Sequence, residues 1–132
     1  MKLSTDNLTA KEPDELIAAL RTHMGWGPLN SGAATHAKIC CEYCGVCLLE
    51  SIMLYYSWEI DHIMPGKGDN LENCALACRT CNHLKHVYPP NGVTREERVR
   101  DAAREIGLRR DRREKELAKV RALVGWRPAA GN

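Results

Sequence analysis

Two pairs of cysteines, each with two residues between its members, constrain the fold of this chain more than any other feature. The pairs are Cys41-x-x-Cys44 and Cys78-x-x-Cys81. A two-residue gap lets both sulfurs of a pair turn toward one ion, and four such sulfurs satisfy the tetrahedral preference of Zn²⁺. The sequence therefore predicts one structural zinc site that joins two distant parts of the chain.

The seven cysteines leave the choice of ligands open at one place. Cys44 and Cys47 also have this spacing. Gly45, directly after Cys44, eases the turn of the pair Cys41-x-x-Cys44 and favours that pair. The remaining cysteines, Cys40, Cys47 and Cys74, are interpreted as small buried apolar residues. A redox dithiol is another interpretation of a cysteine pair, but neither pair lies in a βαβ pattern.

A zinc site also suits the composition. The 132 residues fit one domain, yet the chain has no phenylalanine, and a small core often needs a metal, a disulfide or a partner. Residues 1–10 do not resemble a secretory signal, and no apolar stretch approaches the roughly 18 residues of a membrane span. We therefore expect a cytoplasmic protein with no membrane partner, in a reducing compartment where cysteine pairs hold metal.

The chain divides into three predicted sections of a single domain, residues 1–132. Residues 1–38 are expected to form a helix and a loop, residues 39–90 a zinc-bound core, and residues 91–132 a basic helical extension. Residues 95–132 carry twelve Lys and Arg against seven Asp and Glu. This charge is compatible with a nucleic-acid partner, and equally with a solvated helix that carries many ion pairs.

Within the middle section, the pattern predicts a strand, a loop, a strand and a helix. Residues 57–63 alternate like a strand, in which Glu59 is expected to be exposed. A second strand is expected at 74–77 and a helix at 79–87, before two prolines. Residues 48–56 are apolar but too short for periodicity to decide between strand and helix.

The last section is expected to contain two helical pieces. Thr94 and Glu97 form a capping-box pattern that predicts a helix start. Gly107 is expected to interrupt the helix, and Gly125 to cap its end.

A group of polar residues in the middle section indicates catalytic chemistry. His62 has the side chain type whose ordinary pKa, about 6.5, allows it to accept a proton from water near neutrality. Asp61 offers hard oxygen ligands to a divalent metal, and Asn82 with His86, four residues apart on the predicted helix, can complete the set. Strand alternation places Asp61 and His62 on opposite faces, and a bend or bulge near Pro65 would be needed to bring both to one metal.

These residues, in this order, resemble the HNH endonuclease family in its zinc-knuckle form. The resemblance covers about residues 40–88 and rests on Cys41-x-x-Cys44-Gly, Asp61-His62-Ile63-x-Pro65, Asn73 and Cys78-x-x-Cys81-Asn82-x-x-Lys85. It implies an α+β fold: a ββα-metal finger with a structural zinc site of four cysteines, flanked by N-terminal and C-terminal helices.

The resemblance also implies a role for each matching residue. His62 is the general base that activates water, and Asp61 contacts the catalytic metal. Asn73 orients the base through the loop backbone; because the loop between His62 and Asn73 is compact, Asn70 is the alternative. The third residue of the HNH motif falls on Asn82. A further metal ligand, which some members of the family have four residues later, falls on His86.

The function implied by the resemblance is metal-dependent hydrolysis of DNA, expected to be double-stranded. The catalytic ion is Mg²⁺ or another divalent metal such as Mn²⁺ or Ni²⁺, and candidate phosphate contacts are Lys85, Arg79 and Lys67. The alternative is a catalytically silent zinc-ribbon module that binds nucleic acid. The pair Asp61-His62 favours the enzyme, because a binding module needs no base beside a hard ligand. The sequence indicates neither a target nor an oligomeric state.

Overall fold

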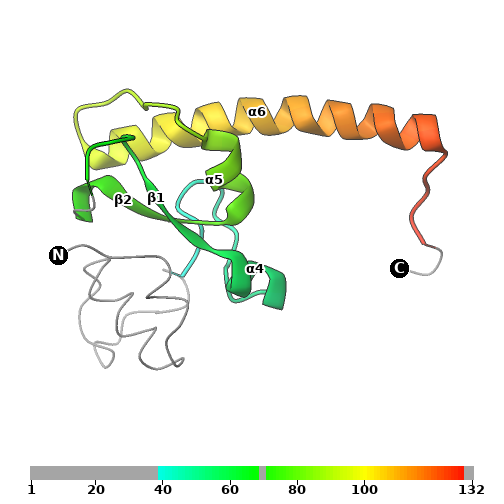
Figure 1. Cartoon of the computed structure of the whole chain (residues 1–132), viewed down its shortest axis with the longest axis horizontal. Coiled ribbons are helices and arrows are strands. Elements are labelled where there is room, and N and C mark those ends of the chain that lie inside the picture. The colour runs from blue at the N-terminus through cyan, green and yellow to red at the C-terminus, as the bar shows by residue number, and fades with distance from the viewer. Residues whose placement is uncertain (1–38, 69–70, 130–132) are drawn as a thin grey trace.

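The computed structural model describes residues 39–68 and 71–129, and the helix expected within residues 1–38 lies outside these ranges. The fold is α+β, with a two-stranded antiparallel sheet, and the predicted order of strand, loop, strand and helix is confirmed (Figure 1). The elements are α4 (Ile52–Ser57), β1 (Glu59–His62), a 3₁₀ turn (Leu71–Asn73), β2 (Cys74–Ala77), α5 (Arg79–Lys85) and α6 (Arg95–Val124).

The sheet is centred on β2, which is buried along its whole length. On one side β2 pairs with β1, so that His62 lies opposite Cys74. On the other side the first cysteine pair is attached, because Glu42 N donates to Leu76 O at 2.9 Å and the Glu42 carboxylate accepts from Leu76 N at 2.8 Å. Strand β2 therefore connects the two halves of the predicted zinc site.

The apolar segment that periodicity left undecided forms the short helix α4. Ser51 begins it, because its hydroxyl accepts a hydrogen bond from Leu54 N at 3.2 Å. The helix ends at Ser57, before the buried Trp58. Within the described ranges, none of the helices has the length and hydropathy that a membrane crossing requires.

Helix α6 has two different halves. Ala102 and Ile106 from its first half are buried in the same core as Leu48, Ile63 and Leu76. The second half extends past the sheet and α5, and residues 111–129 are all exposed (Figure 1). Only the first half of α6 therefore belongs to the packed body of the protein.

The expected break at Gly107 is wrong, because α6 runs through it without interruption. A glycine in a helix costs only about 1 kcal/mol relative to alanine. The neighbouring Ile106 is buried and anchors this part of the helix. The predicted ends are confirmed: Thr94 Oγ1 accepts from Glu97 N at 3.1 Å, and Gly125 closes the helix with a φ of +65°.

Replacing Gly107 with alanine is expected to stabilise the protein by about 1 kcal/mol, because alanine restricts the unfolded chain and favours the helix. A Cβ added there meets no atom within 4 Å. Gly92→Ala is the matched control with the opposite sign, since φ is +143° and the added Cβ would lie 2.8 Å from Glu97 Cβ. Urea unfolding measures both variants, and a destabilising Gly107→Ala would contradict a continuous helix.

Candidate metal centre and catalytic residues

Four cysteine sulfurs meet at the junction of the first cysteine pair with α5. The Sγ atoms of Cys41, Cys44, Cys78 and Cys81 all lie within 4.8 Å of one another, and Cys44 and Cys78 are 3.9 Å apart. Zinc–sulfur bonds of about 2.3 Å in a tetrahedron place sulfurs roughly 3.8 Å apart. The structure brings the predicted four together without Cys47, and the group has the dimensions to bind Zn²⁺.

Each cysteine pair forms a tight turn that directs its sulfurs inward. In the first, Gly45 adopts a φ of +80° and donates its N–H to Cys41 O at 2.8 Å. In the second, Cys78 is the N-cap of α5, and its sulfur accepts from Cys81 N at 3.4 Å. The turn at Gly45 is the local reason why Cys41 rather than Cys47 completes the first pair.

The thiols of this cluster influence one another's ionisation. Hydrogen bonds from Cys78 and Cys81 hold the pKa of Cys41 far below its ordinary value. The hydrogen bond to Cys41 in turn raises the pKa of Cys78 to about 11, and hydrogen bonds to Cys41 and Cys78 raise the pKa of Cys81. A divalent cation removes this conflict, because it binds all four groups as thiolates.

One cation from α6 already faces the cluster. Arg110 Nη2 lies 3.0 Å from Cys81 Sγ. Four thiolates carry more negative charge than one Zn²⁺ neutralises, so a guanidinium at this distance favours the loaded site.

The three cysteines outside the cluster differ from one another. Cys74 is buried, as expected. Cys40 and Cys47 are only half-buried and face each other across an isolated antiparallel bridge, so the expectation of full burial is wrong for these two. They flank the turn of the first cysteine pair.

His62 lies at the end of β1 with its side chain exposed, whereas Asp61 is buried. The expected placement on opposite faces is therefore confirmed. The backbone around His62 is held from two sides: Lys85 Nζ donates to His62 O at 3.0 Å, and Ile63 N donates to Asn73 O at 2.8 Å. These contacts fix the position from which the imidazole extends.

Asp61 lies in a polar group beneath the sheet. Its Oδ2 accepts from Tyr43 OH at 2.5 Å and pairs with Lys85 Nζ at 3.1 Å. Burial raises the pKa of the Asp61 carboxyl, although the Tyr43 hydroxyl and the Lys85 ammonium both favour the carboxylate. Burial, and then the charge of Asp61, raises the pKa of Tyr43, so that its phenol stays protonated as a donor.

Lys85 requires a correction, because its side chain has no exposed surface. An ammonium enclosed between Asp61 and His62 O is not accessible to substrate in this structure, so the expected phosphate contact is wrong. The other two expected contacts, Arg79 and Lys67, are exposed. Lys85 instead positions the residues that precede the loop.

Asn73 holds the loop that follows His62. Its Oδ1 accepts from Met64 N at 2.8 Å, and its Nδ2 donates to Met64 O at 3.0 Å and Gly68 O at 2.9 Å. The side chain is buried, and the three bonds are partly shielded from water. The alternative residue, Asn70, lies outside the described residues. Asn73 is therefore placed where it can orient His62 through the backbone.

Replacing Asn73 with alanine is expected to destabilise the protein by about 3 kcal/mol, because three hydrogen bonds are lost and buried backbone groups lose partners. Asn91→Ala is the matched control, since this asparagine is exposed. Chemical denaturation measures the free energy of unfolding of both variants. Equal stability of the two would show that the bonds to Met64 and Gly68 do not hold the loop.

The two remaining predicted ligands are not brought together on one helix face. Asn82 Nδ2 donates to Glu59 Oε2 at 2.6 Å, so Glu59 is half-buried rather than exposed as expected. His86 lies beyond the end of α5 with a φ of +49°, and its side chain lines a cleft against α6. The expectation that Asn82 and His86 share one face of a helix is wrong, because α5 ends at Lys85, one residue before His86.

Sequence reasoning missed Tyr43 and Arg110 as parts of the site. Tyr43 lies eighteen residues before Asp61, and Arg110 twenty-nine residues after Cys81. No local spacing links such partners, although a Tyr between two zinc-site cysteines is a signal that it lies near the core. Among the described residues, the four cysteines are the one group of three or more His, Cys, Asp or Glu near enough to share an ion.

Comparison with known families adds to this geometry. Residues 41–87 match the family described as HNH endonuclease. The comparisons with curated proteins and with solved structures found no match. The matched segment begins at the first cysteine of the cluster and ends just beyond α5. The part of the chain that contains the four cysteines, His62 and Asn73 is therefore an HNH endonuclease family domain, which implies a nuclease or a nucleic-acid-binding function.

Proposed function

We propose that this protein is a divalent-metal-dependent endonuclease that hydrolyses phosphodiester bonds in double-stranded DNA. The observation that carries the proposal is the placement of His62. Its imidazole is exposed at the end of β1, while Lys85 and the loop held by Asn73 fix its backbone. An exposed base on a fixed backbone is what proton abstraction from a bound water requires.

In the proposed reaction, His62 accepts a proton from the attacking water. The water oxygen forms a bond to phosphorus, and the bond from phosphorus to the leaving sugar oxygen breaks. Lys85 and Asn73 do not touch the substrate in this scheme, and they act as positioning residues for the base. Such positioning matters because a misplacement of about 1 Å can cost a factor of about 10² in rate.

Asp61 and Asn82 are the proposed protein ligands of the catalytic ion. In the part of the chain that the structure describes, Asp61 contacts Tyr43 and Lys85 through Oδ2. Asn82 donates a hydrogen bond through its amide nitrogen, Nδ2. The Oδ1 atoms of both side chains therefore remain to bind a hard cation. When bound, Mg²⁺, Mn²⁺ or Ni²⁺ stabilises negative charge on the scissile phosphate and the leaving oxygen. The four cysteines hold a separate, structural Zn²⁺ in this proposal.

The second candidate function is a module that binds nucleic acid without cleaving it. The ion pair of Asp61 with the buried Lys85 is the observation that favours it, because a carboxylate already paired with an ammonium is a poorer cation ligand. The two functions are separated by incubating the protein with plasmid DNA and with defined duplexes in Mg²⁺, Mn²⁺ or Ni²⁺. Cleavage that depends on the ion supports the endonuclease, and binding without cleavage in every ion overturns it.

A further inference from the structure

A cleft of about 620 Å³ opens between the end of α5 and the middle of α6. Its polar lining consists almost entirely of groups that are cationic or can become so. Five of the side chains are nitrogen-bearing, and one is an acid: His83, His86, Arg109, Arg112, Arg113 and Glu116. The segment that matches the family includes the wall with His83 and His86 but none of α6, which forms the other wall.

Arg109 forms the fixed wall of the cleft. Its Nη1 donates to Leu84 O at 2.8 Å and to Lys85 O at 3.0 Å, and its guanidinium lies 5.4 Å from the ring centre of Tyr88. Its Nε pairs with Glu105 at 2.9 Å. These contacts join α6 to the end of α5, so the cleft has a defined shape.

Arg112 and Arg113 retain donors for a ligand. Both are more than two thirds exposed, at 71% and 72%. Arg112 lies 3.8 Å from Glu105, which Arg109 already engages, and Arg113 uses Nη1 for Glu116 at 2.9 Å. Most of their N–H groups are therefore turned to the cleft or to water, in the planar arrangement that matches a phosphate.

The opposite wall has an unusual backbone. His86 is the one non-glycine residue with a positive φ in the described ranges, at +49°. Such a conformation costs of the order of 1 kcal/mol and tends to occur at functional sites. The chain turns at this residue at the end of α5, and His83 and His86 both line the cleft together with the arginines of α6.

We propose that this cleft binds a backbone phosphate of the nucleic-acid substrate, which makes the middle of α6 a substrate-positioning element. The inference rests on the proposed function. Three arginines against two glutamates repel a metal cation and attract an anion. His83, which lines the cleft, follows Asn82 on α5, so the cleft lies on the same helix as a proposed ligand of the catalytic ion. Phosphate contacts of this kind give register and affinity rather than sequence recognition.

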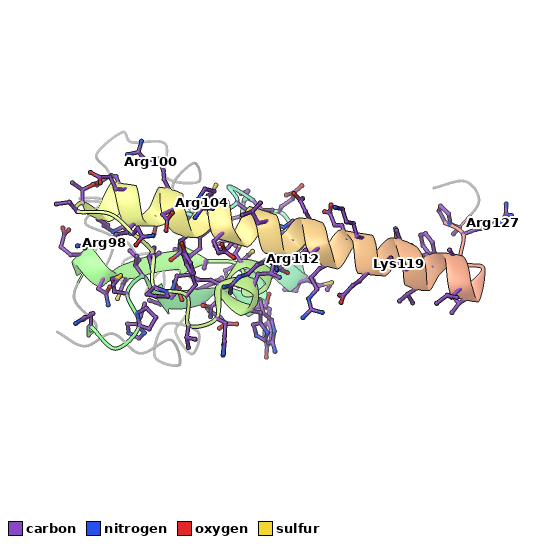
Figure 2. All side chains as sticks on the ribbon, turned by 90° about the horizontal axis from the view of Figure 1, so that it is seen from above. Arg98, Arg100, Arg104, Arg112, Lys119 and Arg127 are labelled. Carbon is purple, nitrogen blue, oxygen red and sulfur yellow. The ribbon has the colours of Figure 1, made fainter. Side chains whose placement is uncertain are left out.

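Figure 2 separates this part of α6 from the rest of its basic surface. Arg112 lies where α6 passes α5, whereas Lys119 and Arg127 lie on the part that extends beyond the body of the protein. Lys119 and Arg127 therefore provide controls with the same charge but a different position.

The test measures binding of a fluorescent 20-base-pair DNA duplex by anisotropy, without added divalent metal. The double variant Arg112→Gln/Arg113→Gln is expected to weaken binding at least tenfold and to reduce the slope of log K against log salt by about one or two. The control Lys119→Gln/Arg127→Gln removes the same charge from the part of the chain beyond the cleft and is expected to change affinity less than threefold. Equal losses of affinity in both double variants would show that only overall charge matters, and would overturn the proposal that the cleft binds a phosphate.

A variant with the opposite expected effect strengthens the test. Glu116→Gln removes the acid that occupies Arg113, so it is expected to tighten binding of the same duplex about threefold. Unchanged or weaker binding by Glu116→Gln would contradict an anion site at this position. Circular dichroism checks that each variant remains folded.

Failure of this inference can be told apart from failure of the proposed function. If the duplex binds through the cleft but no divalent metal supports cleavage, the endonuclease proposal fails and the proposed phosphate site in the cleft is retained. If the protein cleaves DNA while Arg112→Gln/Arg113→Gln keeps wild-type affinity, the cleft fails and the endonuclease stands.

Discussion

The variant His62→Ala is expected to cleave DNA about 10²- to 10⁴-fold more slowly than the wild type, because the group that accepts the proton from water is lost. His62 is exposed, and its backbone contacts to Lys85 and Cys74 involve main-chain atoms that alanine retains. Stability, zinc content and DNA affinity are therefore expected to stay at wild-type values. Single-turnover cleavage of a labelled duplex, at saturating protein, measures the chemical step apart from binding.

The control for this variant is His23→Ala, which also removes an imidazole but lies outside the matched segment. It is expected to cleave at the wild-type rate. Added imidazole should restore part of the activity of His62→Ala, because it can take the place of the missing base. Cleavage by His62→Ala at the rate of His23→Ala would show that another group activates the water.

The variant Cys78→Ser is expected to lose zinc and folding stability together. Zinc at a site of four thiolates contributes about 10 to 16 kcal/mol of apparent binding free energy, which is comparable with the whole stability of a small domain. Cys78 is a ligand candidate and also the N-cap of α5, so its loss affects the metal and the helix start at once. Metal analysis and thermal unfolding on the same samples measure the two effects.

Cys47→Ser is the matched control, because Cys47 is a half-buried cysteine that lies outside the cluster. It is expected to keep one zinc per chain and a melting temperature near that of the wild type. If Cys78→Ser keeps the fold and the wild-type protein contains no zinc, the structural-metal proposal is wrong. If Cys47→Ser loses as much zinc as Cys78→Ser, the zinc is not bound by the four cysteines of the cluster.

Features specified by neighbouring residues could be predicted from the sequence. The cysteine pairs, the turn at Gly45 and the helix start at Thr94 each depend on residues within a few positions, and all three are found in the structure. The strand Cys74–Ala77 was also predictable, because its residues are all small or apolar and it lies between a loop and a helix start. Local spacing carries this information because it reflects backbone geometry.

Features specified by distant partners could not be predicted. Nothing in the sequence around Lys85 shows that its ammonium is enclosed by Asp61 and His62 O, twenty-three or more residues away. The break expected at Gly107 failed for a similar reason, since burial of Ile106 by distant residues outweighs a small local preference. His86 was expected on the helix but lies one residue beyond its end, and helix ends are where sequence patterns are least exact.

The packing of α6 has a consequence for where this domain can be cut or joined to other proteins. The family match ends at residue 87, but Ala102 and Ile106 fill the core, Arg95 binds Glu42, and Arg110 reaches Cys81. The unit that folds is thus longer than the motif that defines the family. A fragment that stops after α5 would lose part of its core and the arginines proposed to bind phosphate, so the motif alone is not expected to fold as an independent module.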